Sequence, residues 1–440
     1  EPKQGVVAFL ESEAKVKASA QVLSSVKRFS QQKKKLRIRQ EYPEHFTRLH
    51  LIAYFGIHEG LGALLDVRLL DSTDSYGRTP LFWAAINGHE STTKALLEMA
   101  YNQDKDKSWK PVLLLNTLLK SSAKLDSKDT FGYTPLLLAS NSGKETSVRL
   151  LLDMDANIEA KDRSHQSSLS LAAQNGHESV VQLLLNRNAD TQSTDLSGWK
   201  PLNYAILNED DAIFQLLLNK DTNIESKEGF HRTPLSHSAV LGYETGVRLL
   251  LDHHANIESK DDLSRTPLSW AAKSGHHRVV RLLLQKGANI ESKDYLSWTP
   301  LLFAADHGHK AVVQLLLEKN AEVDSKVFFT RETPLMLAAE NGHEGIVQLL
   351  LDHGANIESK DRCAQTPLSR AAKNGHNAVV QVLLNNNANV NSPDCYYRTP
   401  LSLAWSDDHE DTVQLLLANN AIFMKDNRPY YQQLLSDLEF

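Results

Sequence analysis

Cysteine is scarce in this sequence, which holds only Cys363 and Cys395 among its 440 residues. Two cysteines exclude a disulfide framework and fit a reducing compartment. Long apolar runs are also missing, since no stretch approaches the roughly 18 residues that cross a bilayer. The N-terminus has no charged-then-apolar leader. We therefore expect a cytoplasmic protein, with the nucleus as the alternative, and no membrane span.

The sequence signatures of catalysis are absent as well. It contains no glycine-rich phosphate-binding loop, no His-Glu-x-x-His and no Gly-x-Ser-x-Gly. Neither cysteine has a His/Asn arrangement that differs from the repeated background. A net charge of −6 argues against nucleic acid as the main partner. We therefore expect no enzymatic activity and no cofactor.

One recurring motif dominates what the sequence does contain. The tripeptide Thr-Pro-Leu begins at Thr79, Thr134, Thr233, Thr266, Thr299, Thr333, Thr366 and Thr399. Degenerate copies at Ser167 and Lys200, with an N-terminal version at Thr47, give eleven units. From Pro135 onward the second motif position recurs every 33 residues, with one interval of 34. A fixed period of this length predicts a repeat array, because a chain this long exceeds one compact core.

Each unit follows the same order of local signals. Asp-x-x-Gly before Thr-Pro predicts a tight turn, after which Thr caps a first helix and Pro opens it. An apolar run such as Leu268–Ala272 follows, and Gly-His, as at Gly275-His276, ends the helix. A second helix carries Val-Val-x-Leu-Leu-Leu, for instance from Val279 to Leu284. Such a helix pair cannot bury its apolar face alone, so neighbouring pairs must stack.

These residues resemble the ankyrin repeat over residues 42–421. The resemblance implies an all-α solenoid of about eleven helix-turn-helix units, each with a β-turn finger. That family usually places His directly after Thr-Pro-Leu, where it ties neighbouring turns together, and only His50 keeps it here. Serine retains part of this hydrogen bonding, whereas Phe82, Leu302 and Met336 cannot. We expect looser turns in those units and an unchanged fold.

Two segments flank the array. We expect residues 1–41 to form a helical segment, which contains a basic run at residues 33–39. We expect residues 422–440 to form a capping helix. The basic run has two interpretations. It is a solvated helix face or a contact to an upstream domain, or else it contacts nucleic acid or an anionic membrane. The stretch from Phe46 to Gly56 resembles the start of the C-terminal ankyrin array in fungal NACHT/NLR-like (STAND) proteins. That resemblance implies the sensor end of such a receptor.

An insertion interrupts the period between Pro80 and Pro135, which lie 55 residues apart. The additional residues fall near 99–120. We expect them to extend one helix and its loop. The insertion is either a tolerated surface extension or a dedicated contact element.

The histidines of the Gly-His helix ends are candidate metal ligands. They are His89, His177, His276, His309, His343 and His376. Equivalent residues of stacked helices lie about 8–10 Å apart, whereas zinc requires nitrogens at about 2.0–2.1 Å. One ion cannot be shared along the column, so we predict structural roles and no metal site.

Positions that vary between repeats are free to bind, whereas constant positions serve the scaffold. The variable columns are the finger tips, the residue before Thr-Pro and the residue before Ala-Ala in the first helix. By the resemblance they line the concave groove and the turn tips, and large aromatics there suit binding hot spots. The candidate partner-binding residues are Trp199, Tyr204, Phe230, His237, Trp270, Tyr295, Trp298, Phe303, Phe328, Phe329 and Arg370. For Trp270 and Phe303 the alternative is packing against neighbouring repeats.

The sequence therefore predicts a non-enzymatic solenoid that binds a protein partner. It is either the recognition part of a fungal NLR-like receptor or a standalone adaptor. The alternative is a docking or regulatory arm for an enzyme whose catalytic domain lies outside this sequence.

Overall fold

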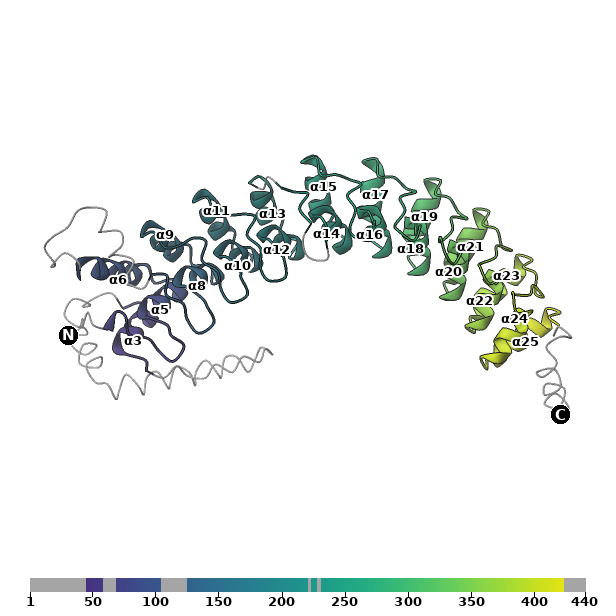
Figure 1. Cartoon of the computed structure of the whole chain (residues 1–440), viewed down its shortest axis with the longest axis horizontal. Coiled ribbons are helices and arrows are strands. Elements are labelled where there is room, and N and C mark those ends of the chain that lie inside the picture. The colour runs from purple at the N-terminus through teal and green to yellow at the C-terminus, as the bar shows by residue number, and fades with distance from the viewer. Residues whose placement is uncertain (1–44, 58–68, 104–124, 221–222, 228–230, 423–440) are drawn as a thin grey trace. The chain divides into compact units, whose positions relative to one another are not determined.

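The computed structural model describes residues 45–57, 69–103, 125–220, 223–227 and 231–422 (Figure 1). Within these ranges the chain contains 21 α-helices and no named strand. The chain divides into two compact units, residues 1–223 and residues 224–440. The expected all-α class is confirmed. The segments 1–41 and 423–440 and the tip residue Phe230 lie outside the described residues.

In the first unit each repeat contributes a first helix and a second helix. The first helices are α3 (Arg48–Phe55), α5 (Pro80–Asn87), α8 (Pro135–Asn141), α10 (Ser168–Gln174) and α12 (Pro201–Leu207). The second helices are α6 (Glu90–Gln103), α9 (Glu145–Asp153), α11 (Glu178–Asn186) and α13 (Asp211–Leu218). Helix α6 has 14 residues where α9 has nine, so the expected helix extension is confirmed as far as Gln103.

The second unit repeats this arrangement six times. Its first helices are α14 (Pro234–Leu241), α16 (Pro267–Lys273), α18 (Pro300–Asp306), α20 (Pro334–Glu340), α22 (Pro367–Lys373) and α24 (Pro400–Ser406). Its second helices are α15 (Glu244–Asp252), α17 (His277–Gln285), α19 (Lys310–Glu318), α21 (Glu344–Asp352), α23 (Asn377–Asn385) and α25 (Glu410–Ala418). First helices stack on first helices and second on second, which makes two rows (Figure 1).

The first helices begin where the motif predicts. In α16 the Thr266 hydroxyl accepts a hydrogen bond from the Ser269 amide at 3.3 Å, and Pro267 occupies the first helical position. A helix start leaves backbone amides without partners, and Thr satisfies one of them, while Pro has no N–H to satisfy. Ala271 and Ala272 then lie fully buried, because small side chains allow the neighbouring first helices to approach closely.

A glycine–histidine contact joins each repeat to the next along most of both units. Gly275 ends α16 with a φ of +81°, and the His309 ring of the following repeat lies against it. The His309 Nε2 atom is 2.9 Å from the Lys273 carbonyl oxygen. The same bond to the preceding repeat is made by His89, His177, His276, His343 and His376. The predicted structural role of the Gly-His column is confirmed.

Carboxylates form a second link between repeats. Glu258 Oε1 accepts a hydrogen bond from the Asn289 amide of the next repeat at 2.7 Å. Equivalent bonds join Asp126 to Asn157, Glu159 to Asp190, Glu225 to Asn256, Glu291 to Glu322, Asp324 to Asn356 and Glu358 to Asn389. This ladder satisfies amides in the linkers, where no helix partner exists.

The turns are tied differently from the expectation based on the missing histidines. His50 does bridge Thr47 and the Arg78 carbonyl, at 2.7 and 2.9 Å. In repeats with Leu302 or Met336 at that position, the motif threonine instead pairs with a linker serine. These pairs are Thr299–Ser325 at 3.2 Å and Thr333–Ser359 at 3.3 Å. The same pair occurs where serine holds that position, as in Thr266–Ser292 at 3.0 Å, so it is a general link of the array and the expectation of looser turns stays a prediction.

The glycine–histidine contact predicts a difference between two glycine substitutions. Gly275 and Gly287 both have positive φ, but a Cβ would lie 2.6 Å from His309 Nδ1 at Gly275 and would meet nothing within 4 Å at Gly287. We expect Gly275→Ala to lower the unfolding free energy by ~1–3 kcal/mol more than Gly287→Ala, because it adds overpacking to the backbone strain.

Urea unfolding followed by circular dichroism measures this difference. Adding His309→Ala to Gly275→Ala should recover part of the loss, since the Cβ then has room. Equal destabilisation by the two single glycine substitutions contradicts the proposed packing.

Candidate functional site

An aspartate shapes most of the described fingers, the turns that precede the Thr-Pro motif, whereas the finger that begins at Val327 is closed by backbone hydrogen bonds from Val327 to Glu332 and from Arg331 to Val327. In the finger that begins at Asp294, this carboxylate accepts hydrogen bonds from the amides of Leu296 and Trp298, at 2.9 and 2.8 Å. The Asp294 amide in turn donates to the Trp298 carbonyl at 3.2 Å. The aspartate carboxylate thus binds the backbone amides two and four residues later in the chain. These hydrogen bonds close the turn, and its tip projects from the stack.

Neighbouring fingers of the second unit are linked tip to tip by backbone hydrogen bonds. The amide at the second finger position donates to a carbonyl of the preceding finger, at its third position or, in the longer finger that begins at Val327, at its fourth position. The pairs are Tyr295–Leu263 at 3.1 Å, Phe328–Leu296 at 2.9 Å, Arg362–Thr330 at 2.9 Å and Cys395–Cys363 at 2.8 Å. The five fingers between residues 261 and 398 therefore make one continuous row.

Large side chains are exposed along this row. We define the fingertip row as Leu263, Tyr295, Phe328, Phe329, Tyr396 and Tyr397. Its aromatic members are between 57% and 69% exposed. Apolar side chains left in water at adjacent tips, over a backbone that is already hydrogen-bonded, are typical of an interaction surface. The exposure expected of Tyr295, Phe328 and Phe329 is confirmed.

The column before Ala-Ala is different, and its expected exposure is wrong. Tyr204, His237, Trp270, Phe303 and Arg370 are each at most 9% exposed. Polar atoms of this column bond the aspartate of their own finger. The pairs are Tyr204 Oη with Asp195 at 2.5 Å, Trp270 Nε1 with Asp261 at 3.2 Å, and Arg370 with Asp361 at 2.7 Å. These side chains face the fingers, so they fasten helix to finger.

Residues before Thr-Pro cover the same column. The guanidinium groups of Arg232 and Arg265 lie 3.8 and 4.0 Å from the Trp270 ring centre, so cationic groups stack against this indole. Half-buried Trp298 lies 5.0 Å from Phe303, ring centre to ring centre. In the first unit, Trp199 packs on Tyr204 at 5.5 Å. The alternative of packing between neighbouring elements therefore holds for Trp270 and Phe303.

Arg370 is held by carboxylates from three places in the second unit. It forms ion pairs with Glu332 at 2.9 Å and Asp361 at 2.7 Å, and with Glu340. A guanidinium so buried requires this compensation. Its role in the structure is to join two fingers and two first helices.

His237 is the buried titratable member of the column. Burial, and then the positive charge of Arg232, lowers the pKa of His237 to about 4. The ring is therefore neutral in the folded chain at neutral pH.

No group of three or more potential metal ligands occurs among the described residues. None of the described helices is long and apolar enough to cross a membrane.

Comparison with protein families gives a match over nearly the whole chain. The family model for ankyrin repeats, in three copies, matches residues 16–108, 110–195, 169–261, 202–294, 257–327, 293–361 and 335–427. Comparison with curated proteins gives no significant match.

The state of His237 predicts a pH dependence of stability. The unfolded chain binds this proton below about pH 6.5, whereas the folded chain binds it only near pH 4. The His237 contribution is thus fully present above pH 6.5 and is lost as the pH falls toward 4. We expect His237→Leu to reduce the loss of unfolding free energy between pH 7 and pH 5 by ~1–2 kcal/mol.

Leucine is the matched replacement because Leu337 and Leu403 occupy the same column. Urea midpoints at the two pH values are the measurement, with exposed His277→Gln as the control. If His237→Leu keeps the full pH sensitivity of the parent chain, the column histidine does not carry it.

Proposed function

Since this chain belongs to the ankyrin-repeat family, we propose that it binds a protein partner through the fingertip row of its second unit. Ankyrin repeats are generally protein–protein interaction modules and form a non-catalytic fold. The observation that carries the proposal is that three of the five backbone-linked fingers carry exposed aromatic side chains, namely those that begin at Asp294, Val327 and Asp394.

The chemistry of the fingertip row suits a protein interface. Phe328 and Phe329 pack edge to face, with ring centres 4.8 Å apart, and form the apolar centre. Exposed charges at Asp262, Arg331 and Arg362 stand beside the aromatics. An apolar centre within a polar rim is the common anatomy of protein interfaces.

Rigidity adds to this argument. The fingers that begin at Asp261, Asp294, Asp361 and Asp394 are closed by these aspartates, and the finger that begins at Val327 is closed by its own backbone hydrogen bonds. All five are joined to each other, so their backbones are ordered before a partner arrives. Binding then costs little loop-ordering entropy, and buried aromatic area contributes more of its free energy to affinity. Tyrosine and phenylalanine suit this role because they offer large contact area with two rotatable bonds.

The column before Ala-Ala has a different place in the proposal. Trp270, Phe303, Arg370 and their equivalents position the fingers by bonding and packing beneath them. They act on partner binding through the fingers. The contact residues we propose are therefore the members of the fingertip row, with Trp298 at its half-buried edge.

The biological setting follows one of the two routes indicated by the sequence. The first is the recognition part of an NLR-like receptor, or a standalone adaptor, and the stretch from Phe46 to Gly56 favours the receptor. The second is a docking or regulatory arm of an enzyme. An upstream nucleotide-binding motif in the full-length gene product favours the receptor, and an upstream catalytic domain favours the arm.

The proposal predicts which surface substitutions weaken binding. In the 440-residue chain, Phe328→Ser with Phe329→Ser should raise the Kd for a captured partner at least about tenfold, or ~1.4 kcal/mol. The reason is the loss of buried aromatic area. Calorimetry with the purified partner measures the effect.

The matched control is Phe131→Ser, which removes an exposed finger aromatic from the first unit. It should leave the Kd unchanged, and none of these exposed substitutions should alter the circular dichroism. Hydrogen exchange should show protection by the partner at residues 261–265, 294–298 and 327–332. Protection confined to the first helices, with unchanged affinity in the double variant, would assign binding to another surface.

A further inference from the structure

The two cysteines of the chain meet at adjacent fingertips. Cys363 occupies the third position of the finger that begins at Asp361, and Cys395 the second position of the finger that begins at Asp394. The Cys395 amide donates to the Cys363 carbonyl at 2.8 Å. Both residues are exposed, and both thiols are free.

Their side chains also meet. The Cys363 thiol lies close enough to Cys395 to contribute to the raised pKa of the Cys395 thiol. A hydrogen bond of 2.8 Å from the amide of one residue to the carbonyl of the other brings the two Cα atoms near the separation of about 4.4–6.8 Å that a disulfide tolerates. A bond between the two sulfurs therefore requires side-chain rotation and no movement of α22 or α24.

We propose that Cys363 and Cys395 form a reversible dithiol–disulfide pair that staples the last two fingers of the array. The oxidant is a small-molecule disulfide of the glutathione type. One cysteine thiolate attacks this disulfide, which gives a mixed disulfide and releases one glutathione thiolate. The second cysteine thiolate attacks the protein sulfur of the mixed disulfide, forms the internal bond and releases the second glutathione. The two protons lost by the cysteines are taken up by the two released thiolates.

The order of attack follows from the surroundings. Desolvation, the neighbouring Cys363 and the charge of Asp394 raise the pKa of Cys395. A higher pKa leaves less thiolate at neutral pH, so Cys363 is expected to attack first and Cys395 to resolve the mixed disulfide. Because both sulfurs are exposed, a reductant can reach the bond and reverse it.

The staple regulates the proposed binding surface, and this part rests on the proposed function. Tyr396 and Tyr397 of the fingertip row directly follow Cys395. Before oxidation the two fingers are joined here by one backbone hydrogen bond, and afterwards also by a covalent bond. Oxidation thus restricts how far these tyrosines can move apart from the preceding finger, and it changes partner affinity.

Glutathione disulfide, applied to the reduced 440-residue chain, tests the pair directly. Intact-mass measurement should show that the parent chain loses two hydrogens, keeps no adduct and remains monomeric, and that dithiothreitol restores its mass. Cys363→Ser and Cys395→Ser should each retain one glutathione, because the resolving thiol is missing. Retention of two glutathiones by the parent chain, or cross-linked dimers, overturns the proposal.

A second arm separates this inference from the proposed function. Partner affinity is measured for the parent chain and for Cys395→Ser, each reduced and oxidised. A change of at least about threefold in the parent chain alone supports regulation of the fingertip row. An internal disulfide without any change in affinity removes the regulatory role, and the mass result stands whether or not the fingertip row binds the partner.

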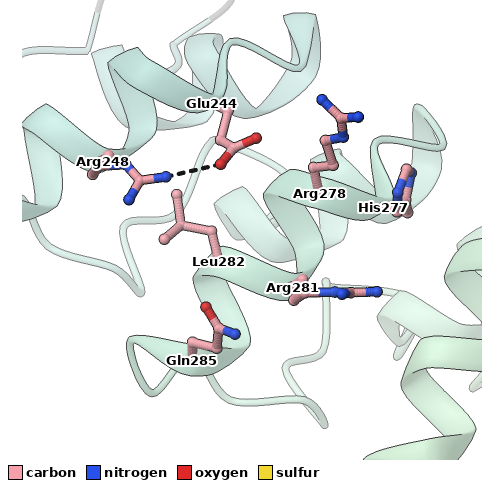
Figure 2. A pocket seen from close by; sticks show the side chains of 7 residues that line it. All are labelled: Glu244, Arg248, His277, Arg278, Arg281, Leu282 and Gln285. Atoms are coloured by element: carbon pink, nitrogen blue, oxygen red, sulfur yellow. Dashed lines mark hydrogen bonds and ion pairs between the residues drawn. The ribbon is translucent and has the colours of Figure 1, made fainter.

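A different observation, on the second helices, carries an independent inference. A cleft of about 400 Å³ lies between α15 and α17, lined by Glu244, Arg248, His277, Arg278, Arg281, Leu282 and Gln285 (Figure 2). Arg248 is neutralised by Glu244 of its own helix at 2.9 Å. Arg278 and Arg281 have no carboxylate within ion-pair distance among the described residues.

Comparison between the repeats shows that α17, α19 and α23 have no acidic residue in their first turn, and that α17 alone of these three begins with His-Arg. The first residue of the second helix is acidic in α9, α15 and α21, and in α9 it pairs with the arginine four residues later at 2.5 Å. In α17 that position holds His277, and Arg278 adds a further cation. The first turn of α17 contains no acidic residue.

We infer that this cleft binds a phosphorylated side chain of a peptide segment. Arginine offers paired donors that match phosphate oxygens, and Arg278 and Arg281 are available for them. The volume exceeds that of one phosphate group.

Fluorescence anisotropy with a degenerate phosphoserine peptide library and its unphosphorylated counterpart tests the cleft. We expect binding only of the phosphorylated library, and a loss of at least about tenfold in affinity for Arg278→Ala with Arg281→Ala. Arg149→Ala, which removes a paired arginine at the equivalent site of α9, is the matched control and should bind normally. Equal binding of both libraries, preference for anionic phospholipid vesicles, or normal binding by the double variant overturns the inference.

Discussion

The structure depends on one constraint, which is that no repeat can bury its own apolar side chains. Val279, Val280 and Leu283 of α17 are fully buried, and only the neighbouring repeats can cover them. Any two successive repeats must therefore keep the same offset. Three contacts set this offset at different places in the repeat. They are the glycine–histidine contact at the end of the first helix, the carboxylate ladder in the linkers, and the Thr–Ser pairs at the start of the first helix. The nearly invariant period of the sequence is the consequence.

This constraint also determines where binding residues can lie. Polar groups at constant positions form hydrogen bonds with the neighbouring repeat. Polar groups of the column before Ala-Ala form hydrogen bonds with the finger. Backbone amides of the fingers are taken by aspartates such as Asp294 and by the adjacent finger. The large side chains at the tips of the second unit remain exposed. A rigid backbone with exposed aromatics is the arrangement that the stacking leaves available for a partner.

The sequence predicted most of the fold because its signals are local. Thr-Pro starts a helix and Gly-His ends it wherever they occur, and a fixed period places neighbours side by side. Variation between repeats is a weaker signal for binding residues, because a position that varies can still have a structural role. Trp270, Tyr204 and Arg370 differ in chemistry, yet each bonds the aspartate of its own finger. Side chains of different chemistry can join the first helix to the finger. Variability alone therefore could not separate the buried column from the exposed tips.

The cysteine pair shows what a simple period conceals. Equivalent positions recur every 33 residues, but the finger bond joins the second position of one finger to the third position of the preceding finger. Residues that touch at the tips are therefore 32 apart, as in Tyr295–Leu263, Phe328–Leu296 and Cys395–Cys363. A comparison at the full period pairs Cys395 with Arg362 and misses the contact. In an array of this kind, side-chain pairs should be sought at the spacing of the hydrogen bonds, because those bonds bring the side chains together.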